Sequence, residues 1–354
     1  MDTPTWINYV FYEEDDHTYN YIECVPPGEL NLGALSRIEE LTKDVLANKI
    51  SFSEAKIAIE QIKKKPISYG KGIEMFAFML SAGSFSLILD AGWTSSIVAF
   101  LLGAIVYGIT LLARKSGYIR STLESLVALV ATLITGLLAL YFDQINISLT
   151  ILASIIVFIP GLAITTALEE ITSKSLVSGT AKLFDALISL FKQFFGVVMG
   201  LAILFLFVDL ESNKVINTVP EWMDYIAIFL LAISLTPVLR VRPKDVLYSV
   251  VAGFVCYFTT TMFDFAGLLV SIFIGTIAAV LISKLFARMT GSPELIFLVP
   301  GTIMLVPGSK AFISLSSVFI DTTNTYSHMG EQVLYIFMGI IGGLIFSGTF
   351  MDRK

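Results

Sequence analysis

The sequence predicts an all-α polytopic membrane protein, because apolar residues dominate it and run in long stretches. Apolar side chains make up 55% of the 354 residues and charged ones 15%, whereas about a quarter of the residues in a soluble domain are charged. The mean hydropathy is +0.81, and from residue 72 onward one apolar stretch follows another. Within lipid, helices satisfy every backbone polar group of such stretches, so we expect helical spans rather than open strands.

A small polar domain is expected before the apolar stretches. The aromatic and β-branched segments Trp6–Tyr12 and Thr18–Val25 flank a polar turn, which predicts a β-hairpin. Asn31 is placed to cap a first amphipathic helix, and Ser51 and Glu54 have the spacing of a capping box at the start of a second. No signal peptide is expected, because the first 30 residues are polar, aromatic and acidic.

Ten apolar stretches then approach the roughly 20 residues that a helix needs to cross a bilayer. We expect spans at about 72–91, 94–113, 123–141, 147–168, 186–208, 225–239, 246–263, 266–286, 295–319 and 333–350. The chain therefore divides into a cytosolic domain at residues 1–70, a five-helix module at 71–208 and a second five-helix module at 222–354. Within the fifth span, Gly196-x-x-x-Gly200 predicts close contact with a neighbouring helix.

The distribution of basic residues predicts the orientation of the spans. With the N-terminal domain inside, the inner loops and ends hold Arg114, Lys115, Arg120, Lys174, Lys182, Arg240, Arg242, Lys244, Lys284, Arg288, Arg353 and Lys354. The outer loops hold a single base, Lys214, beside the acidic residues Asp143, Asp209, Glu211, Asp321 and Glu331. Because basic residues favour the cytoplasmic side, we expect a multi-pass protein of the plasma membrane (the cell inner membrane) with both termini in the cytoplasm.

Two Pro-Gly pairs interrupt apolar stretches at corresponding places in the two modules. Pro160-Gly161 lies in the fourth expected span and Pro300-Gly301 in the ninth, and the latter pair is repeated as Pro307-Gly308. Proline removes a backbone donor and glycine loosens a helix, so we expect both helices to be broken there. Such backbone persists in lipid only where it is buried in protein or lines a cavity. Since each module has an odd number of spans, the second must be inverted, which is a plan of transporters that bind substrate near the midplane.

The motifs around these breaks resemble those of the threonine/serine exporter family over nearly the whole chain. The motifs of the family's first module are similar to three segments here: Pro160-Gly161 with the small and hydroxylated residues that follow it, Glu170, and Ser178–Lys182. The motif of the family's second module is similar to the double Pro-Gly. Two features depart from the family: Lys182 stands where arginine is usual, and the family's additional first helix does not precede the hairpin. The resemblance implies export of threonine and serine, or of a small dicarboxylate such as succinate, driven by the membrane potential or proton gradient.

A zwitterionic amino acid needs polar groups of both signs at the breaks. Backbone N–H groups at the start of a half-helix suit its carboxylate, and neighbouring hydroxyls suit a hydroxylated substrate. The candidate substrate-binding residues are Pro160, Gly161, Thr165, Thr166, Pro300, Gly301, Thr302, Pro307, Gly308, Ser309 and Lys310. Lys310 is an ionisable residue in an apolar run, with snorkelling to the outer interface as the alternative. For the hydroxylated residues the alternative is a hydrogen bond back to their own helix.

Four charged residues of the fourth and fifth spans are candidates for coupling or gating. Glu169 and Glu170 could form an inner gate, bind the substrate's ammonium group or carry a proton, with an ordinary helix end as the alternative. Asp185 and Lys192 lie two turns apart on nearly one helix face. We expect Lys192 to pair with Glu170, with a structural ion pair as the favoured role.

The function class that these patterns favour is a secondary transporter. An intramembrane enzyme is not expected, because the spans carry no Ser/His pair, no zinc-ligand spacing and no paired aspartates at the membrane centre. The two cysteines, Cys24 and Cys256, lie far apart, so no metal site and no cofactor is expected. An ATP-driven pump is not expected, because the sequence has no phosphate-binding loop. A channel-like pore stays an alternative. The expected partners are a small amino acid, protons and the lipid bilayer, with no nucleic acid and with a homo-oligomer as an option.

Overall fold

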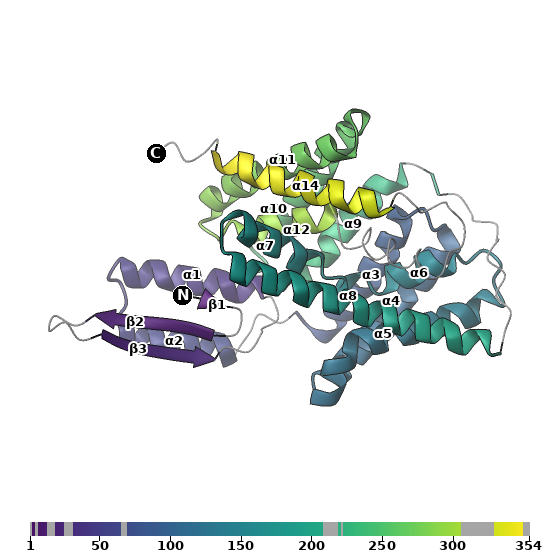
Figure 1. Ribbon diagram of the computed structural model, residues 1–354, viewed down its shortest axis with the longest axis horizontal. Helices are drawn as coiled ribbons and strands as arrows, with labels where there is room; N and C mark the ends of the chain where they lie inside the picture. Colours follow the sequence, from purple (N-terminus) through teal and green to yellow (C-terminus); the bar gives the residue numbers. More distant parts are fainter. Residues whose placement is uncertain are drawn as a thin grey trace.

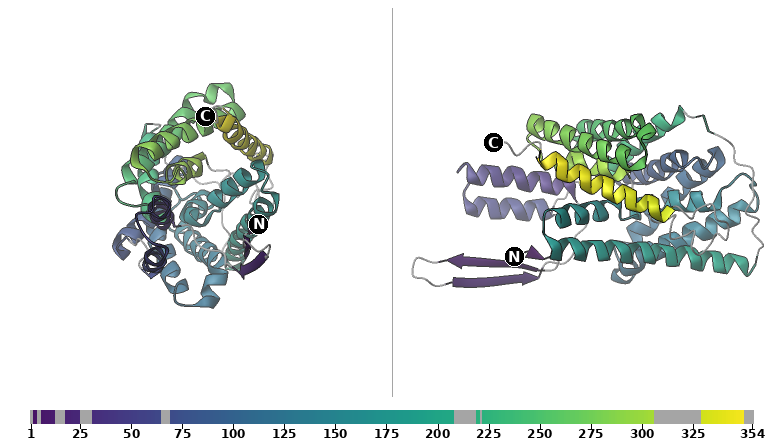
Figure 2. Two further views of the ribbon diagram at one scale, coloured as in Figure 1. Left: turned by 90° about the vertical axis from the view of Figure 1, so that its left-hand side faces the viewer. Right: turned by 45° about the horizontal axis from the view of Figure 1, so that its top comes forward.

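The computed structural model describes residues 2–3, 6–12, 18–24, 31–64, 69–207, 219–220, 222–305 and 329–349. In this part the protein is a bundle of apolar helices with a small α+β domain at one end (Figure 1). The C-terminal end of α14 (Met329–Thr349) lies at the same end of the bundle as this domain (Figures 1 and 2).

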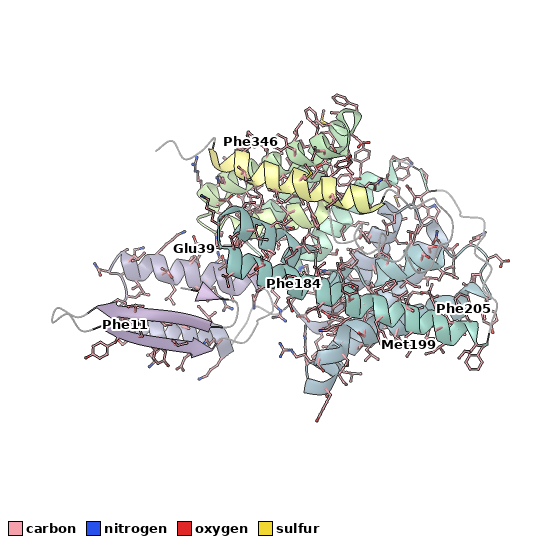
Figure 3. All side chains as sticks on the ribbon, viewed as in Figure 1. Phe11, Glu39, Phe184, Met199, Phe205 and Phe346 are labelled. Carbon is pink, nitrogen blue, oxygen red and sulfur yellow. The ribbon has the colours of Figure 1, made fainter. Side chains whose placement is uncertain are left out.

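The first part of the N-terminal domain is an antiparallel sheet of three strands, β1 (Asp2–Thr3), β2 (Trp6–Tyr12) and β3 (Thr18–Cys24). Strands β2 and β3 form the predicted hairpin and are paired along their whole length. The aromatic side chains of Tyr9 and Phe11 are exposed on this hairpin, and Figure 3 shows Phe11.

Two helices, α1 (Leu32–Leu46) and α2 (Phe52–Lys64), follow the sheet. The side chain of Asn31 caps α1 by accepting an amide hydrogen bond at 2.9 Å. At the start of α2, the Glu54 carboxylate accepts from the Ser51 amide at 2.8 Å, and the Ser51 hydroxyl accepts from the Glu54 amide at 3.3 Å. This is the reciprocal geometry of a capping box, so both predicted helix starts are confirmed.

The membrane helices follow the apolar stretches of the sequence. The first half contains α3 (Lys71–Ile88), α4 (Trp93–Ala113), α5 (Gly117–Ala139), α6 (Ile147–Ser154), the 3-10 turn η1 (Ile156–Phe158), α7 (Gly161–Thr172) and α8 (Leu176–Phe205). The second half contains α9 (Met223–Val238), α10 (Val246–Met262), the 3-10 turn η2 (Asp264–Ala266), α11 (Leu268–Thr290), α12 (Leu295–Leu305) and α14.

Among the described residues, five helices are long and apolar enough to cross a membrane, or six if α6 and α7 count as one bent span. Four shorter apolar helices accompany them. Large apolar side chains also point outward: Phe184 and Phe205 on α8 and Phe346 on α14 are 66%, 57% and 53% exposed (Figure 3). Outward apolar side chains on long apolar helices are typical of lipid contact, so the bundle after the N-terminal domain is that of an all-α membrane protein.

The fourth apolar stretch is broken where the sequence predicts it. Helices α6 and α7 meet at an angle of 55° across η1 and Pro160. The break frees the carbonyl of Phe158, and the buried amide of Gln193 on α8 donates to this oxygen at 2.7 Å. The irregular backbone is thus buried in protein and hydrogen-bonded, as a break within lipid requires.

The prediction that the helix breaks at Pro300-Gly301 is wrong, because α12 runs unbroken through both residues. Pro300 cannot donate to the carbonyl of Ile296, four residues earlier. The hydroxyl of Ser249 on α10 donates to this carbonyl instead, at 2.9 Å. The helix therefore keeps its acceptor satisfied. The repeated pair at Pro307-Gly308 lies outside the described residues.

Helix α9 tolerates an internal proline by the same device. Pro237 leaves the carbonyl of Ile233 without its helical donor, and the hydroxyl of Thr236 donates to that oxygen at 2.8 Å. In α9 the donor is the neighbouring residue, whereas in α12 it comes from another helix.

Helix α1 docks on the second half of the bundle. The amide of the buried Leu32 donates to the carbonyl of Leu239 at 3.2 Å. The guanidinium of Arg242 donates to the carboxylates of Glu40 at 2.7 Å and Asp245 at 3.1 Å. Hydrogen bonding to Arg242 holds the pKa of Glu40 below its ordinary value, although partial burial opposes the shift. The N-terminal domain is thus fixed to the loop between α9 and α10.

Candidate functional site

A cavity of about 350 Å³ lies beside the break between α6 and α7. Its walls come from both halves of the bundle, because α3, α5, α7, α8, α9, α12 and η1 all contribute side chains. The apolar lining residues are Phe85, Ile156, Val157, Phe158, Ile159, Pro160, Ala163, Ala186, Leu231, Leu235, Val238, Leu239 and Ile303. This volume is within the range of small-molecule sites.

The polar wall of the cavity is formed by Glu124 on α5 and by Asp185, Ser189 and Lys192 on α8. The hydroxyl of Ser189 donates to Glu124 Oε1 at 2.7 Å. Lys192 Nζ lies 3.5 Å from Glu124 Oε2. The side chain of Glu124 is 27% exposed and that of Lys192 45%, so charges of both signs remain accessible inside an otherwise apolar site.

Close packing of α5 against α8 positions these residues. A Cβ atom at Gly196 would come within 2.2 Å of the Ser125 carbonyl oxygen, and one at Gly200 within 2.8 Å of Thr132. The predicted contact motif is therefore confirmed, since only glycine permits this approach. The Ser125 hydroxyl also donates to the backbone carbonyl of Lys192 at 2.8 Å, which ties the two helices together at the level of the ion pair.

The ion pair lies well inside its two helices rather than at their far ends. At 1.5 Å per residue, Glu124 and Lys192 are each about 20 Å from the C-terminal ends of α5 and α8. Because the hydrocarbon core is about 30 Å thick, both residues lie within it if these helix ends reach its far boundary. Ionisable residues at such depth indicate a functional site.

The start of α7 adds a positive dipole end to the cavity. Pro160 and Ala163, which flank Gly161 and the first turn of α7, line the wall. A Cβ atom built on Gly161 would meet nothing within 4 Å, so space remains beside the backbone. The first-turn N–H groups of a helix lack helical acceptors and favour anions.

Three of the predicted hydroxyl ligands bond to their own helices. Thr165 donates to the Gly161 carbonyl at 2.9 Å and Thr166 to the Ala163 carbonyl at 3.2 Å. Thr302 donates to the Leu298 carbonyl at 3.1 Å. None of these threonines lines the cavity, and neither do Pro300 and Gly301, which are buried within α12. Residues 306–310, with Ser309 and Lys310, lie outside the described residues.

The expected pair between Lys192 and Glu170 is replaced by two separate pairs. Glu170 on α7 pairs with Lys182 on α8, and Lys192 pairs with Glu124. Lys182 lies ten residues before Lys192, so the two lysines occupy different levels of α8. Asp185 is exposed and lines the cavity. Glu169 belongs to α7.

Glu124, Ser189 and Gln193 did not stand out in the sequence patterns. Glu124 lies at the second position of the expected span 123–141, where it has the appearance of a helix-end charge. The structure continues α5 back to Gly117, which moves Glu124 inward. Glu124 would have been identified as a candidate if it had been counted as an ionisable residue inside the span. Among the described residues, no group of three or more His, Cys, Asp or Glu could hold a metal ion.

These features define a polytopic helical membrane protein with a charged cavity at a broken helix between its two halves. Two family models match the chain: "Putative threonine/serine exporter" at residues 1–204 and "Threonine/Serine exporter, ThrE" at residues 224–350. The chain belongs to the threonine/serine exporter family.

Several curated proteins are similar to this chain. A threonine/serine exporter of Corynebacterium glutamicum is 23% identical over 173 residues, which are 48% of this chain and 35% of that protein. A pheromone-regulated membrane protein 10 of Eremothecium gossypii is 23% identical over 280 residues, 77% of this chain and 38% of that protein. An uncharacterized protein of Schizosaccharomyces pombe is 30% identical over 187 residues, 49% of this chain and 24% of that protein.

The matches span well under half the length of each of these relatives. No solved structure matches the chain.

Proposed function

We propose that the chain is a secondary transporter that exports small polar metabolites, foremost threonine and serine, in exchange for protons. The observation that carries this proposal is the cavity beside the α6–α7 break, which presents charges of both signs well inside α5 and α8. The family membership and the exporter of C. glutamicum among its relatives support the same function.

The composition of the cavity favours a zwitterion over a dicarboxylate. Its described lining holds two carboxylates, Glu124 and Asp185, and one ammonium group, Lys192. A substrate with one positive and one negative end can pair with both kinds of group. A dianion such as succinate would bring two further carboxylates beside the existing pair, which costs free energy at short range in a site of low dielectric.

Proton coupling needs a carboxylate that can be protonated during the transport cycle. Glu170 and Asp185 lie along the inner half of α7 and α8, and Glu170 is paired with Lys182. Together with Glu169 and Lys192 they are the proposed coupling and gating residues. The threonines beside the Pro-Gly pairs remain proposed substrate contacts that other conformations would have to bring to the cavity. Lys310 also remains a proposed substrate contact.

The two halves are proposed to be inverted repeats. The hydroxyl of Tyr69, just before α3, donates to the carbonyl of Val241, just after α9, and α3 packs against α9. The first helices of the two halves therefore run in opposite directions. Both also end on a residue with positive φ, Asp90 at 54° and Arg240 at 55°.

A second correspondence links the segment with the Pro-Gly pair in each half to the second helix of that half. In the first half, the Asn146 amide at the start of α6 donates to Ser95 Oγ on α4 at 2.9 Å. In the second half, Ser292, before α12, donates to Asp245 Oδ1, before α10, at 2.9 Å. Equivalent helix starts are thus joined at opposite ends of the bundle, which supports an inverted repeat with the cavity between its halves.

We further propose that the protein lies in the plasma membrane with both termini in the cytoplasm. The N-terminal domain and the C-terminal end of α14 share one end of the bundle. The same end carries Arg242 and Lys244, whereas the loop after α5 carries Asp143. Basic residues favour the cytoplasmic side.

Counterflow in proteoliposomes tests the function. Vesicles that contain the purified protein would be loaded with unlabelled threonine, serine or succinate and given the same labelled compound outside, with a set pH gradient. We expect saturable accumulation of threonine and serine that responds to the gradient. Accumulation of succinate alone would favour the dicarboxylate function, and flux that does not saturate would favour a channel.

A further inference from the structure

We propose that Glu124 and Lys192 exchange their mutual ion pair for the two charged ends of the substrate, so that Glu124 selects zwitterions over dicarboxylates. Glu124 accepts the substrate's ammonium group. Lys192 and the first turn of α7 bind its carboxylate. This inference rests on the proposed export function and assigns its specificity to particular residues of the cavity.

The geometry of the Glu124 carboxylate leaves one oxygen without a hydrogen-bond donor. Oε1 accepts a hydrogen bond from Ser189 at 2.7 Å. Oε2 is buried, and within the described part of the chain no hydrogen-bond donor satisfies it. Lys192 Nζ approaches Oε2 only to 3.5 Å, longer than the 2.7–2.9 Å of a charge-assisted hydrogen bond. An ammonium group in the cavity would supply the donor that this oxygen lacks.

The backbone around the pair is closely packed, whereas the lysine carries its charge on a flexible side chain. Gly196 and Gly200 hold α8 against α5, and Ser125 fixes the carbonyl of Lys192. The Cα atoms of Glu124 and Lys192 therefore keep their separation. Lysine carries its charge on a flexible four-carbon stem, so Lys192 can leave Glu124 without a helix movement.

The carboxylate of the substrate has a separate place at the break. The first turn of α7 borders the cavity at Pro160 and Ala163, and its positive dipole end favours an anion. Lys192 lines the same cavity and can approach that anion once Glu124 is occupied by the ammonium group. The two charged ends of one amino acid thus replace one internal ion pair, and the charge balance of the cavity is preserved.

The first test uses the unmodified protein and needs no variant to fold. Counterflow of labelled threonine would be measured against four unlabelled competitors: threonine, N-acetylthreonine, threonine amide and succinate. N-acetylthreonine lacks the ammonium group, and threonine amide lacks the carboxylate. Because each analogue loses hydrogen bonds between charged groups, we expect both analogues to compete at least about tenfold more weakly than threonine.

The second test assigns the discrimination to single residues. In Glu124→Gln, we expect threonine to compete about tenfold more weakly and its advantage over N-acetylthreonine and succinate to shrink. In Lys192→Met, the advantage over threonine amide should shrink instead. The matched control is Glu74→Gln, which also neutralises a buried carboxylate. Glu74 is held by Tyr107 and Arg114, does not line the cavity and should leave both ratios unchanged.

The outcomes separate this inference from the function on which it rests. If the protein accumulates neither threonine nor serine, the export function fails and the inference with it. If it accumulates threonine but N-acetylthreonine competes equally well, the ammonium site is wrong while the export function stands. Unchanged selectivity in a folded Glu124→Gln protein would also show that the ammonium site is wrong while the export function stands. If this variant fails to insert, the competition series in the unmodified protein still decides whether the site recognises the ammonium group of the substrate.

Discussion

Ser249 on α10 donates its hydroxyl proton to the carbonyl oxygen of Ile296 on α12 over 2.9 Å, and this is the oxygen that Pro300 leaves without a helical donor. A proline in the middle of an apolar helix is therefore compatible with regular structure when a neighbouring helix supplies a hydroxyl. The same bond fastens α12, which contributes Ile303 to the cavity, to α10.

The Ser249 bond predicts a coupling between two substitutions. Ser249→Ala should lower the free energy of unfolding by about 1–3 kcal/mol, because a buried carbonyl loses its donor. In a Pro300→Ala background, residue 300 regains its N–H and satisfies Ile296, so the loss should be smaller. Thermal unfolding of the four proteins in detergent gives the coupling energy. An equal loss in both backgrounds would show that Ser249 does not compensate for the proline.

The contact between α5 and α8 gives a prediction on geometry. Gly196→Ala should lower both thermal stability and threonine flux, because the new Cβ would approach the Ser125 carbonyl to 2.2 Å and push α8 away from Glu124. Gly108→Ala on α4 is the control, since its Cβ would meet nothing within 4 Å. That control should keep its flux and unfold at the same temperature or slightly higher. Equal effects of the two substitutions would argue against a positioning role for the glycine contact.

The docking of α1 predicts a dependence on pH. Hydrogen bonding to Arg242 holds the pKa of Glu40 below its ordinary value of 4.5, so the docked state favours the carboxylate. The stabilisation is complete above the ordinary value and is lost as the pH falls through the lowered pKa. The protection factor of the α1 amides against hydrogen exchange, which removes the intrinsic pH dependence of exchange, should therefore fall under acid conditions. Glu40→Gln should show low protection of α1 at every pH.

The control for this experiment is Glu60→Gln on α2. Glu60 is exposed and pairs with Lys64 within its own helix, so its loss should not alter exchange in α1. If the protection factor of α1 is the same from neutral to acid pH in the unmodified protein, the Glu40–Arg242 pair does not hold the domain in place.

The parts of the fold that the sequence predicts depend on local patterns. The hairpin follows from the strand pattern of β2 and β3, and the starts of α1 and α2 follow from Asn31 and from the Ser51–Glu54 box. The break before α7 follows from Pro160. In each of these cases the deciding residues are neighbours in the chain, so no knowledge of helix packing is needed.

The errors concern partners that are distant in the sequence. Whether Pro300 breaks its helix depends on Ser249, which precedes it by more than 50 residues and lies on another helix. Lys192 pairs with Glu124 rather than Glu170 because α8 packs closely against α5 at that level. A sequence pattern identifies charged and broken segments within apolar stretches, but the choice of partner depends on which helices touch.

The pair between Glu170 and Lys182 leads to the last prediction, which concerns coupling. Glu170 lies on α7 after the helix break, and its partner Lys182 lies in the first part of α8. If Glu170 carries the proton, Glu170→Gln should remove or displace the pH dependence of threonine flux while counterflow at equal pH continues.

The exchange of the two charges, Glu170→Lys with Lys182→Glu, separates coupling from structure. The double variant should recover thermal stability if the pair stabilises the contact between α7 and α8, because an ion pair of reversed sense can form across the same helices. It should not recover the pH response, since the carboxylate then stands on α8 rather than on the half-helix at the break. Recovery of both properties, or an unchanged pH profile in Glu170→Gln, would remove Glu170 from the proton path and leave it a structural residue.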